Sequence, residues 1–243
     1  MQGKYEKTFI SSNYHKENDM KTRRLLALAI VAWLCCAGIS AQVAYPKDMF
    51  AEEMAFQVKY KGAQPTITNF ISSYFDSDEE WPEIWGTCRD AWKAHIAGKR
   101  LEKGCNILLD SKNGFMQFTQ NLKEAYGDDF TAEDKYYIEM CYWNCADKKH
   151  KVFAVSMRGK ERGKWTNGQY DGVTFYVYNN KSRKMYQVPS EDLGITIDYK
   201  NVGDIYPVHA FILPREGKDI IQETYLGDKK TERHFKWDGM RFK

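Results

Sequence analysis

The chain has 243 residues, of which 43% are hydrophobic and 28% are charged, and its formal net charge is +3. The positive excess lies in residues 1–41, which hold six of the 36 basic and three of the 33 acidic residues. The rest of the chain is formally neutral. This argues against nucleic-acid binding, because phosphate contacts need a basic excess.

A segment with the three parts of a secretory signal begins at Met20. Basic residues follow Met20, an apolar run covers residues 25–39, and small residues precede the expected cleavage site after Ala41. The run is shorter than the roughly 20 residues that a spanning helix needs. We therefore expect export from a Gram-negative cytoplasm to the periplasm, the outer membrane or the exterior, without a permanent membrane span.

Residues 1–19 are polar and precede this signal, so translation starts either at Met20 or at Met1 with a long segment before the apolar run. Either start leaves the same division of the chain. Residues 1–41 are expected to be an N-terminal extension and a cleaved signal peptide. Residues 42–243 are expected to form one globular domain, which is long enough to bury its own core.

Two helices are predicted early in this domain, after a short strand around residues 55–60. Apolar residues recur at i, i+3, i+4, i+7 and i+8 across 67–75, which is the spacing of one helical face. A second helix is predicted from Pro82, which suits a first helical turn, to Gly98, which ends it.

From Cys105 onward the apolar period changes to two, which is typical of strands. Asn113-Gly114 predicts a tight hairpin turn with both residues at positive φ. A short helix is predicted at 131–134. The expected strands cover residues 106–110, 115–120, 136–146, 151–157, 173–178, 184–188, 209–213 and 220–225, with a terminal hairpin over 235–242. We expect an α+β fold in which two N-terminal helices pack on one face of an antiparallel, hairpin-rich β-sheet.

The strand at 136–146 is apolar on both of its faces, so it should be central and covered on both sides. Helices are expected on one side, and the C-terminal strands or a partner on the other. A cystatin-like cone with an apolar pocket between helices and sheet is an alternative.

Four cysteines remain after the expected cleavage, namely Cys88, Cys105, Cys141 and Cys145. An oxidising compartment permits two disulfides, although buried free thiols fit equally well. Cys141 and Cys145 would lie about 13 Å apart on one strand, so each would need Cys88 or Cys105 as its partner. Paired C-x-x-C spacings are absent, and we therefore predict no metal site.

Trp165 lies between Gly163 and Gly172 in a segment rich in turn-forming residues. A large aromatic side chain there is expected to be partly exposed and suited to stacking on a sugar or a peptide. Alternatively, Trp165 closes the segment over the sheet. The candidate ligand-binding residues are Trp165, Tyr170, Tyr176 and Tyr178.

No motif of a nucleophile elbow, a zinc protease, a P-loop or a dinucleotide fold occurs in the sequence. A pair of Cys141 and His150 as nucleophile and base is conceivable, but no spacing requires it. We predict no catalytic residue and no cofactor. The expected function is non-enzymatic binding of an envelope protein, a glycan or a peptide; the alternative is a hydrolase acting on envelope or dietary polymers.

Five segments between residues 109 and 242 carry a resemblance to known proteins. They are residues 110–118 (DSKNGFMQF), 139–144 (EMCYWN), 150–156 (HKVFAVS), 213–220 (LPREGKDI) and 235–242 (FKWDGMRF). With these segments the chain resembles exported proteins of unknown function in the Bacteroides group. The resemblance implies an exported protein of this general architecture and assigns no catalytic residue.

Overall fold

The structure is a computed structural model that describes residues 45, 50, 55–77, 81, 83–166, 172–197 and 206–243. The chain divides into two units, 1–44 and 45–243, and every described residue belongs to the second. The predicted signal, its cleavage site and the choice of start residue lie outside the described residues, as does Tyr170. Among the described helices, none has the length and apolar character needed to span a membrane.

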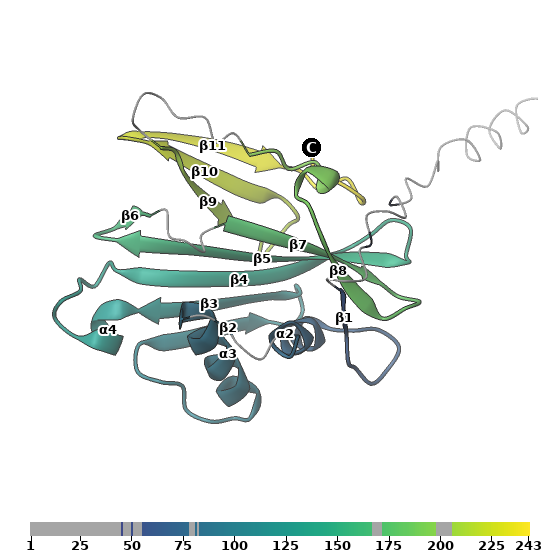
Figure 1. The fold of residues 1–243 in the computed structure, drawn as a ribbon, viewed down its shortest axis with the longest axis horizontal. Coiled ribbons are helices and arrows are strands. Elements are labelled where there is room, and N and C mark those ends of the chain that lie inside the picture. Colours follow the sequence, from purple (N-terminus) through teal and green to yellow (C-terminus); the bar gives the residue numbers. More distant parts are fainter. Residues whose placement is uncertain are drawn as a thin grey trace, which may run out of the picture. The chain divides into compact units, whose positions relative to one another are not determined.

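Antiparallel sheets dominate the described part of the chain (Figure 1). The larger sheet has the order β1-β8-β7-β5-β4-β3-β2, and β6 pairs with the end of β5. Its strands are β1 (Ala55–Gln57), β2 (Cys105–Asp110), β3 (Phe115–Asn121), β4 (Lys135–Asn144), β5 (His150–Glu161), β6 (Lys164–Trp165), β7 (Gly172–Asn179) and β8 (Lys184–Val188). The smaller sheet has the order β11-β10-β9 and contains β9 (Val208–Ile212), β10 (Ile220–Leu226) and β11 (Lys229–Phe235). The predicted antiparallel, hairpin-rich β-sheet is confirmed.

The described helices are few and short. They are α2 (Ile67–Phe75), α3 (Glu83–Ile96), α4 (Leu122–Tyr126) and the 3-10 helix η3 (Glu191–Leu193). The first two match the predicted apolar stripes. The helix predicted at 131–134 is wrong: the Asp134 side chain instead accepts the backbone N–H of Thr131 at 2.7 Å and holds a turn. The helix of this region is α4, where the Asn121 side chain accepts the N–H of Glu124 and caps the first turn.

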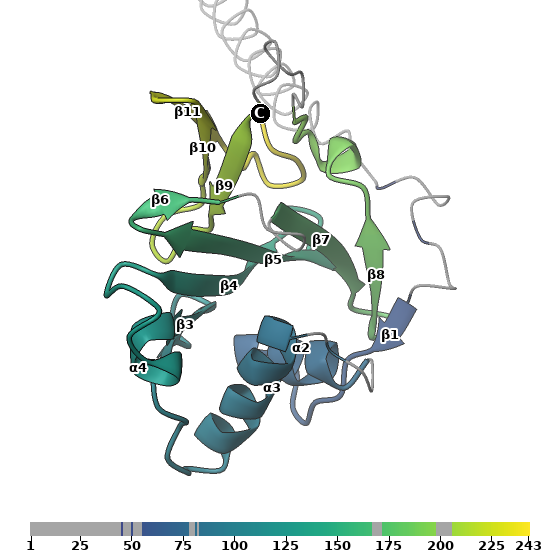
Figure 2. The same cartoon turned by 60° about the vertical axis from the view of Figure 1, so that its left-hand side comes forward.

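The larger sheet has a hydrophobic core on each face. Helices α2 and α3 lie on one side of this sheet, and the smaller sheet lies on the other (Figure 2). Side chains of the two helices belong to the first core, and those of the smaller sheet and the C-terminal segment belong to the second. Along β4, Ile138 and Met140 belong to the first core, whereas Cys141 and Trp143 belong to the second. The predicted central strand with two covered faces is therefore confirmed.

Aromatic rings fill the first core, beneath the two helices. Phe70 of α2 lies with its ring centroid 5.3 Å from that of Tyr142 and 5.8 Å from that of Phe153. Both phenylalanines are fully buried. This packing occupies the space in which a cystatin-like cone would hold its apolar pocket, so it does not favour that alternative.

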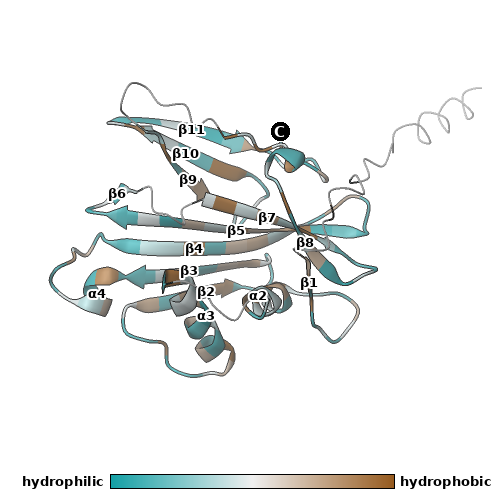
Figure 3. Cartoon of the chain, viewed as in Figure 1, coloured by the Kyte–Doolittle hydropathy of each residue, from teal (hydrophilic) through white to brown (hydrophobic). Residues whose placement is uncertain are grey.

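The C-terminal segment contains the expected hairpin and a strand that was not predicted. In the hairpin over 235–242, Trp237 and Phe242 form an antiparallel bridge, the backbones of Lys236 and Lys243 exchange hydrogen bonds at 2.9 and 3.0 Å, and the N–H of Asp238 donates to the carbonyl of Arg241 at 2.9 Å. The preceding strand β11 was not predicted, because six of its seven residues are exposed and polar and show no apolar alternation (Figure 3). Charged residues are typical of such an edge strand, since they discourage pairing with other chains.

The turn at Asn113-Gly114 also differs from its prediction. Asp110 pairs with Phe115, so four residues connect β2 and β3, and of the two predicted turn residues only Gly114 has a positive φ, of 68°. The Asp110 carboxylate accepts hydrogen bonds from the backbone and the side-chain amide of Asn113. This local side-chain capping stabilises a wider loop than the two-residue turn.

The turn at Asp238 gives a prediction about acid stability. Partial burial raises the pKa of the Asp238 carboxyl, but hydrogen bonds from Lys243 and from the backbone N–H groups of Arg241 and Met240 lower it to about 2, below its ordinary value of 3.8. A lowered pKa stabilises the fold above the unfolded value, and this contribution disappears as the pH falls through the folded value. We expect Asp238→Asn to lower the free energy of unfolding at neutral pH, with a difference from wild type that shrinks between about pH 4 and pH 2. Urea unfolding across this range measures the difference, and a constant difference would contradict the assignment.

Candidate functional site

Trp165 lies on a short hairpin at the end of β5. Arg162 and Gly163 form its two-residue turn, with φ values of 50° and 79°. Positive φ at both central positions is the mark of a type I′ turn, whose twist matches the flanking strands. The resulting register places Trp165 directly opposite Lys160. Trp165 is thus a half-buried strand residue rather than a loop residue.

The indole of Trp165 joins the two sheets. Its Nε1–H donates a 2.9 Å hydrogen bond to Oε2 of Glu223, on β10 of the smaller sheet. On the larger sheet, the Lys160 ammonium lies 4.3 Å from the centroid of the indole, and Tyr137 meets the indole edge-to-face at 5.8 Å. These contacts fix the orientation of the ring, and a fixed ring loses little entropy when a ligand binds.

Glu223 is held as a carboxylate. Besides Trp165, it accepts hydrogen bonds from the hydroxyl of Tyr225 at 2.8 Å and the ammonium of Lys230 at 2.6 Å. Burial raises the pKa of Glu223, but these three donors lower it overall. The carboxylate therefore stays charged and binds Trp165 and Tyr225 side by side.

A cavity of about 370 Å³ opens next to Trp165 and is called here the Trp165 cavity. Its volume lies in the range of small-ligand pockets. Tyr206, at its rim, is 67% exposed, which is unusual for a large aromatic residue. The residues that line the cavity are Lys160, Gly163, Lys164, Trp165, Tyr206, Val208, Tyr225, Gly227 and Asp228.

A buried ion pair supports this region. Arg158 donates to both carboxylate oxygens of Glu139, at 2.7 and 2.8 Å, and also to the backbone carbonyl of Phe211 on β9 at 3.0 Å. The guanidinium carbon of Arg158 lies 5.3 Å from the centroid of the Trp165 indole. The same ion pair therefore connects the two sheets and packs against Trp165.

The other candidate ligand-binding residues do not gather at this cavity. Tyr176 and Tyr178 are buried in the first core, on the helix-covered face of the larger sheet. Tyr176 packs against Tyr74 of α2, and the hydroxyl of Tyr178 donates to that of Tyr60. Trp165 shares the opposite face with Lys160. Of the four predicted ligand-binding residues, Trp165 lines the Trp165 cavity, Tyr176 and Tyr178 lie in the first core, and Tyr170 is outside the described residues.

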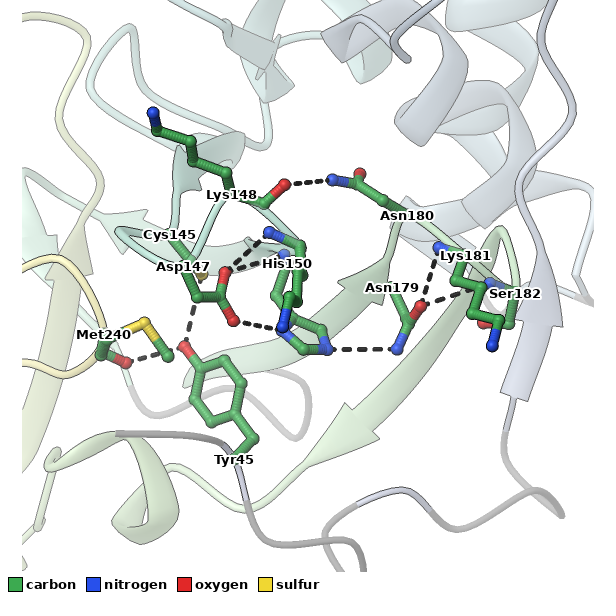
Figure 4. Close-up of polar contacts among 11 residues, drawn as sticks. Tyr45, Cys145, Asp147, Lys148, His150, Asn179, Asn180, Lys181, Ser182 and Met240 are labelled. Carbon is green, nitrogen blue, oxygen red and sulfur yellow. Dashed lines mark hydrogen bonds and ion pairs between the residues drawn. The ribbon is translucent and has the colours of Figure 1, made fainter. Parts of the chain in front are cut away.

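Figure 4 shows a second polar cluster, around His150, at the far end of β5. Nδ1 of His150 lies 2.6 Å from Oδ2 of Asp147, and Nε2 lies 3.1 Å from Nδ2 of Asn179. The oxygen of the Asn179 side chain accepts two backbone N–H groups, from Lys181 and Ser182, so its NH₂ group must face His150.

The His150 ring is therefore assigned as neutral, with a proton on Nδ1 that is donated to Asp147 and an Nε2 that accepts from Asn179. Both ring nitrogens have partners within the fold, and these partners belong to two neighbouring hairpin turns. The geometry makes His150 a structural link between the β4–β5 and β7–β8 turns rather than a free general base.

The nearby thiols are also poorly suited to nucleophilic chemistry. Cys145 lies 3.5 Å from the hydroxyl of Tyr45, and burial is the main cause that raises the pKa of its thiol to about 12. Burial likewise raises the pKa of Cys141 well above its ordinary value. The thiolate is the reactive species, so neither residue forms an activated pair with His150 at neutral pH.

These environments predict the order of alkylation in the native protein. Among the described cysteines only Cys105 is half-buried, while Cys88, Cys141 and Cys145 are buried. We expect iodoacetamide to label Cys105 first and the other three only on unfolding, as followed by mass spectrometry of the peptides. Rapid labelling of Cys145 in the folded protein would contradict the burial described above.

All four described cysteines are free in the structure. Cys88 and Cys105 contact the first core, whereas Cys141 and Cys145 lie in the second. Because the larger sheet separates the two pairs, the disulfides of Cys141 and Cys145 with Cys88 and Cys105 that the sequence permitted do not form.

Sequence reasoning found Trp165 but not its surroundings. Lys160, Tyr206, Tyr225 and Glu223 come from three separate strands or their flanks, and no local motif links them to Trp165. The alternation along 158–160 and the turn-forming pair Arg162-Gly163 were the only local signals that could have placed Lys160 opposite Trp165.

Comparison of the chain with protein-family models, with curated proteins and with solved structures gives no match. The functional assignment therefore depends on the geometry of the Trp165 cavity and on the sequence.

Proposed function

We propose that this chain is an exported, non-enzymatic α+β protein of the cell envelope that binds a glycan or a peptide in the Trp165 cavity. The single observation that carries the proposal is the cavity of about 370 Å³ walled by Trp165, Tyr206 and Tyr225. Aromatic walls with a few fixed polar groups are typical of ligand pockets. Aromatic faces suit the apolar faces of sugar rings and peptide side chains.

Two aromatic side chains of the cavity wall are held in place by hydrogen bonds, which supports ligand binding. Glu223 fixes Trp165 and Tyr225 through two hydrogen bonds before any ligand arrives. A wall that is already ordered avoids the entropic cost of arranging side chains during association. By contrast, both ring nitrogens of His150 have partners within the fold and burial raises the pKa of the Cys145 thiol, which favours binding over nucleophilic catalysis as the role of this protein.

The experiment that tests the proposal is binding of the full-length chain to glycan and peptide arrays, followed by titration of the strongest ligand. We expect Trp165→Ala to weaken binding by a factor of about ten or more, since loss of a buried aromatic contact costs about 1–3 kcal/mol. Tyr126→Ala is the matched control, because Tyr126 is exposed on α4 and lines no part of the Trp165 cavity. Equal binding by wild type and Trp165→Ala would remove the cavity from the proposal.

Export rests on the basic, apolar and small-residue parts of the segment from Met20 to Ala41, and the resemblance to exported proteins agrees with it. We expect the protein recovered from the cell envelope to start after Ala41, as measured by intact mass. An intact chain starting at Met1 in the cytosolic fraction would contradict export.

A further inference from the structure

The described lining of the Trp165 cavity has more positive than negative side chains. Lys160 and Lys164 line it, and Asp228 is the only acidic residue among the described residues that line it. Lys164 and Asp228 are 3.9 Å apart and both almost fully exposed, so their pairing is weak. Among the described residues no carboxylate pairs with Lys160, whose ammonium rests on the Trp165 ring.

The two carboxylates near Trp165, those of Glu223 and Glu139, already have partners within the fold. Glu223 is neutralised by Lys230 and accepts from Trp165 and Tyr225. Glu139 accepts both terminal nitrogens of Arg158, the backbone N–H of Leu213 and the side-chain amide of Gln117. Each acid is thus paired with a cation other than Lys160, namely Lys230 for Glu223 and Arg158 for Glu139.

Arg158 packs near the same ring but adds no net charge, because Glu139 balances it. Its side chain is 6% exposed, its guanidinium packs near the Trp165 ring, and its Nε is buried without a hydrogen-bond partner. A positive field is stronger next to a partly buried wall than in open solvent, because the surroundings screen it less.

From this arrangement we infer that the ligand of the Trp165 cavity is an acidic sugar, whose ring stacks on the aromatic wall and whose carboxylate pairs with Lys160. This inference rests on the proposed function and names its ligand class. A compact cavity favours a ring-shaped ligand over an extended peptide. A ligand carboxylate would give Lys160 the charged partner that the described part of the fold does not supply.

The test compares two probes that differ in a single group. Methyl β-glucuronide carries a carboxylate where methyl β-glucoside carries a hydroxymethyl group. Calorimetric titration of the full-length chain is expected to give at least about ten-fold tighter binding of the glucuronide. Raising the salt concentration should reduce this preference, because ions screen the charge pair.

Variants at Lys160 separate charge from shape. Lys160→Met keeps the aliphatic stem and should remove the preference for the glucuronide, whereas Lys160→Arg should retain most of it. Lys149→Met is the matched control, since Lys149 is an exposed lysine in the turn that precedes β5, at the opposite end of that strand from Lys160.

The outcomes distinguish the inference from the function on which it rests. Equal binding of both probes, lost in Trp165→Ala, would overturn the acidic-sugar inference and leave the binding cavity in place. Failure of both probes to bind at about 10 mM would also overturn it, while a different array ligand that depends on Trp165 would preserve the proposed function. Glucuronide binding that is unchanged in both Lys160→Met and Trp165→Ala would contradict both.

Discussion

Glu139→Ala is expected to lower the free energy of unfolding by about 3–5 kcal/mol, the usual cost of removing one partner of a buried ion pair. Glu139 is 2% exposed and accepts hydrogen bonds from Arg158, Leu213 and Gln117. The substitution leaves the Arg158 charge buried among these unsatisfied donors. Urea unfolding of the full-length chain measures the loss.

Two control variants identify the cause. The double variant Glu139→Met with Arg158→Met removes both charges and should recover a large part of the lost stability, because apolar residues often replace buried ion pairs at little cost. Asp128→Asn breaks the exposed contact with Lys123 and should cost less than about 1 kcal/mol. A Glu139→Ala loss as small as that of Asp128→Asn would show that the buried pair does not hold the two sheets together.

Gly194→Ala is expected to cost at least about 3 kcal/mol, because a new side chain there combines backbone strain with a collision. Gly194 ends the helix η3 with a φ of 85°, and an added Cβ would lie 2.2 Å from the backbone oxygen of Phe242. The Phe242 backbone cannot withdraw freely, since its N–H donates to the carbonyl of Leu193 at 2.8 Å and its ring is buried in the second core.

Gly227→Ala is the matched control for Gly194→Ala. Gly227 has a φ of 59°, and an added Cβ there meets no atom within 4 Å, so this variant has the strain without the collision. We expect it to cost about 1 kcal/mol. Thermal and urea unfolding of both variants give the comparison, and equal losses would contradict the close packing of the C-terminal segment against η3.

Periodic patterns predicted the elements whose packing is local. The stripe at 67–75 became α2, and the two apolar faces of 136–146 became a strand buried on both sides, because one side-chain period determines each of these outcomes. Strand β11 was not predicted, because its residues are polar and it is held as a strand by its pairing with β10. Tertiary contacts overrode local preference there.

At the candidate site, too, local features were predicted and features that depend on tertiary contacts were not. The composition around Trp165 indicated an exposed aromatic residue, and the structure places that residue at a cavity. The hydrogen bond from Trp165 to Glu223 spans 58 positions of the chain and depends on how the two sheets pack, which no local pattern encodes. Tyr176 and Tyr178 were predicted to bind a ligand but are buried beneath the helices. Strand alternation places both residues on one face of the sheet, but it does not reveal which face the helices cover.

The most direct test of the proposed function follows the indole N–H of Trp165 by ¹H–¹⁵N NMR during titration with the best array ligand. Trp92 provides an internal reference, because it is 1% exposed and packs in the first core. Binding in the Trp165 cavity predicts a saturable shift of the Trp165 resonance, with the affinity found by calorimetry and with Trp92 unchanged. Saturable binding that leaves the Trp165 resonance in place would contradict the assignment of this cavity as the binding site.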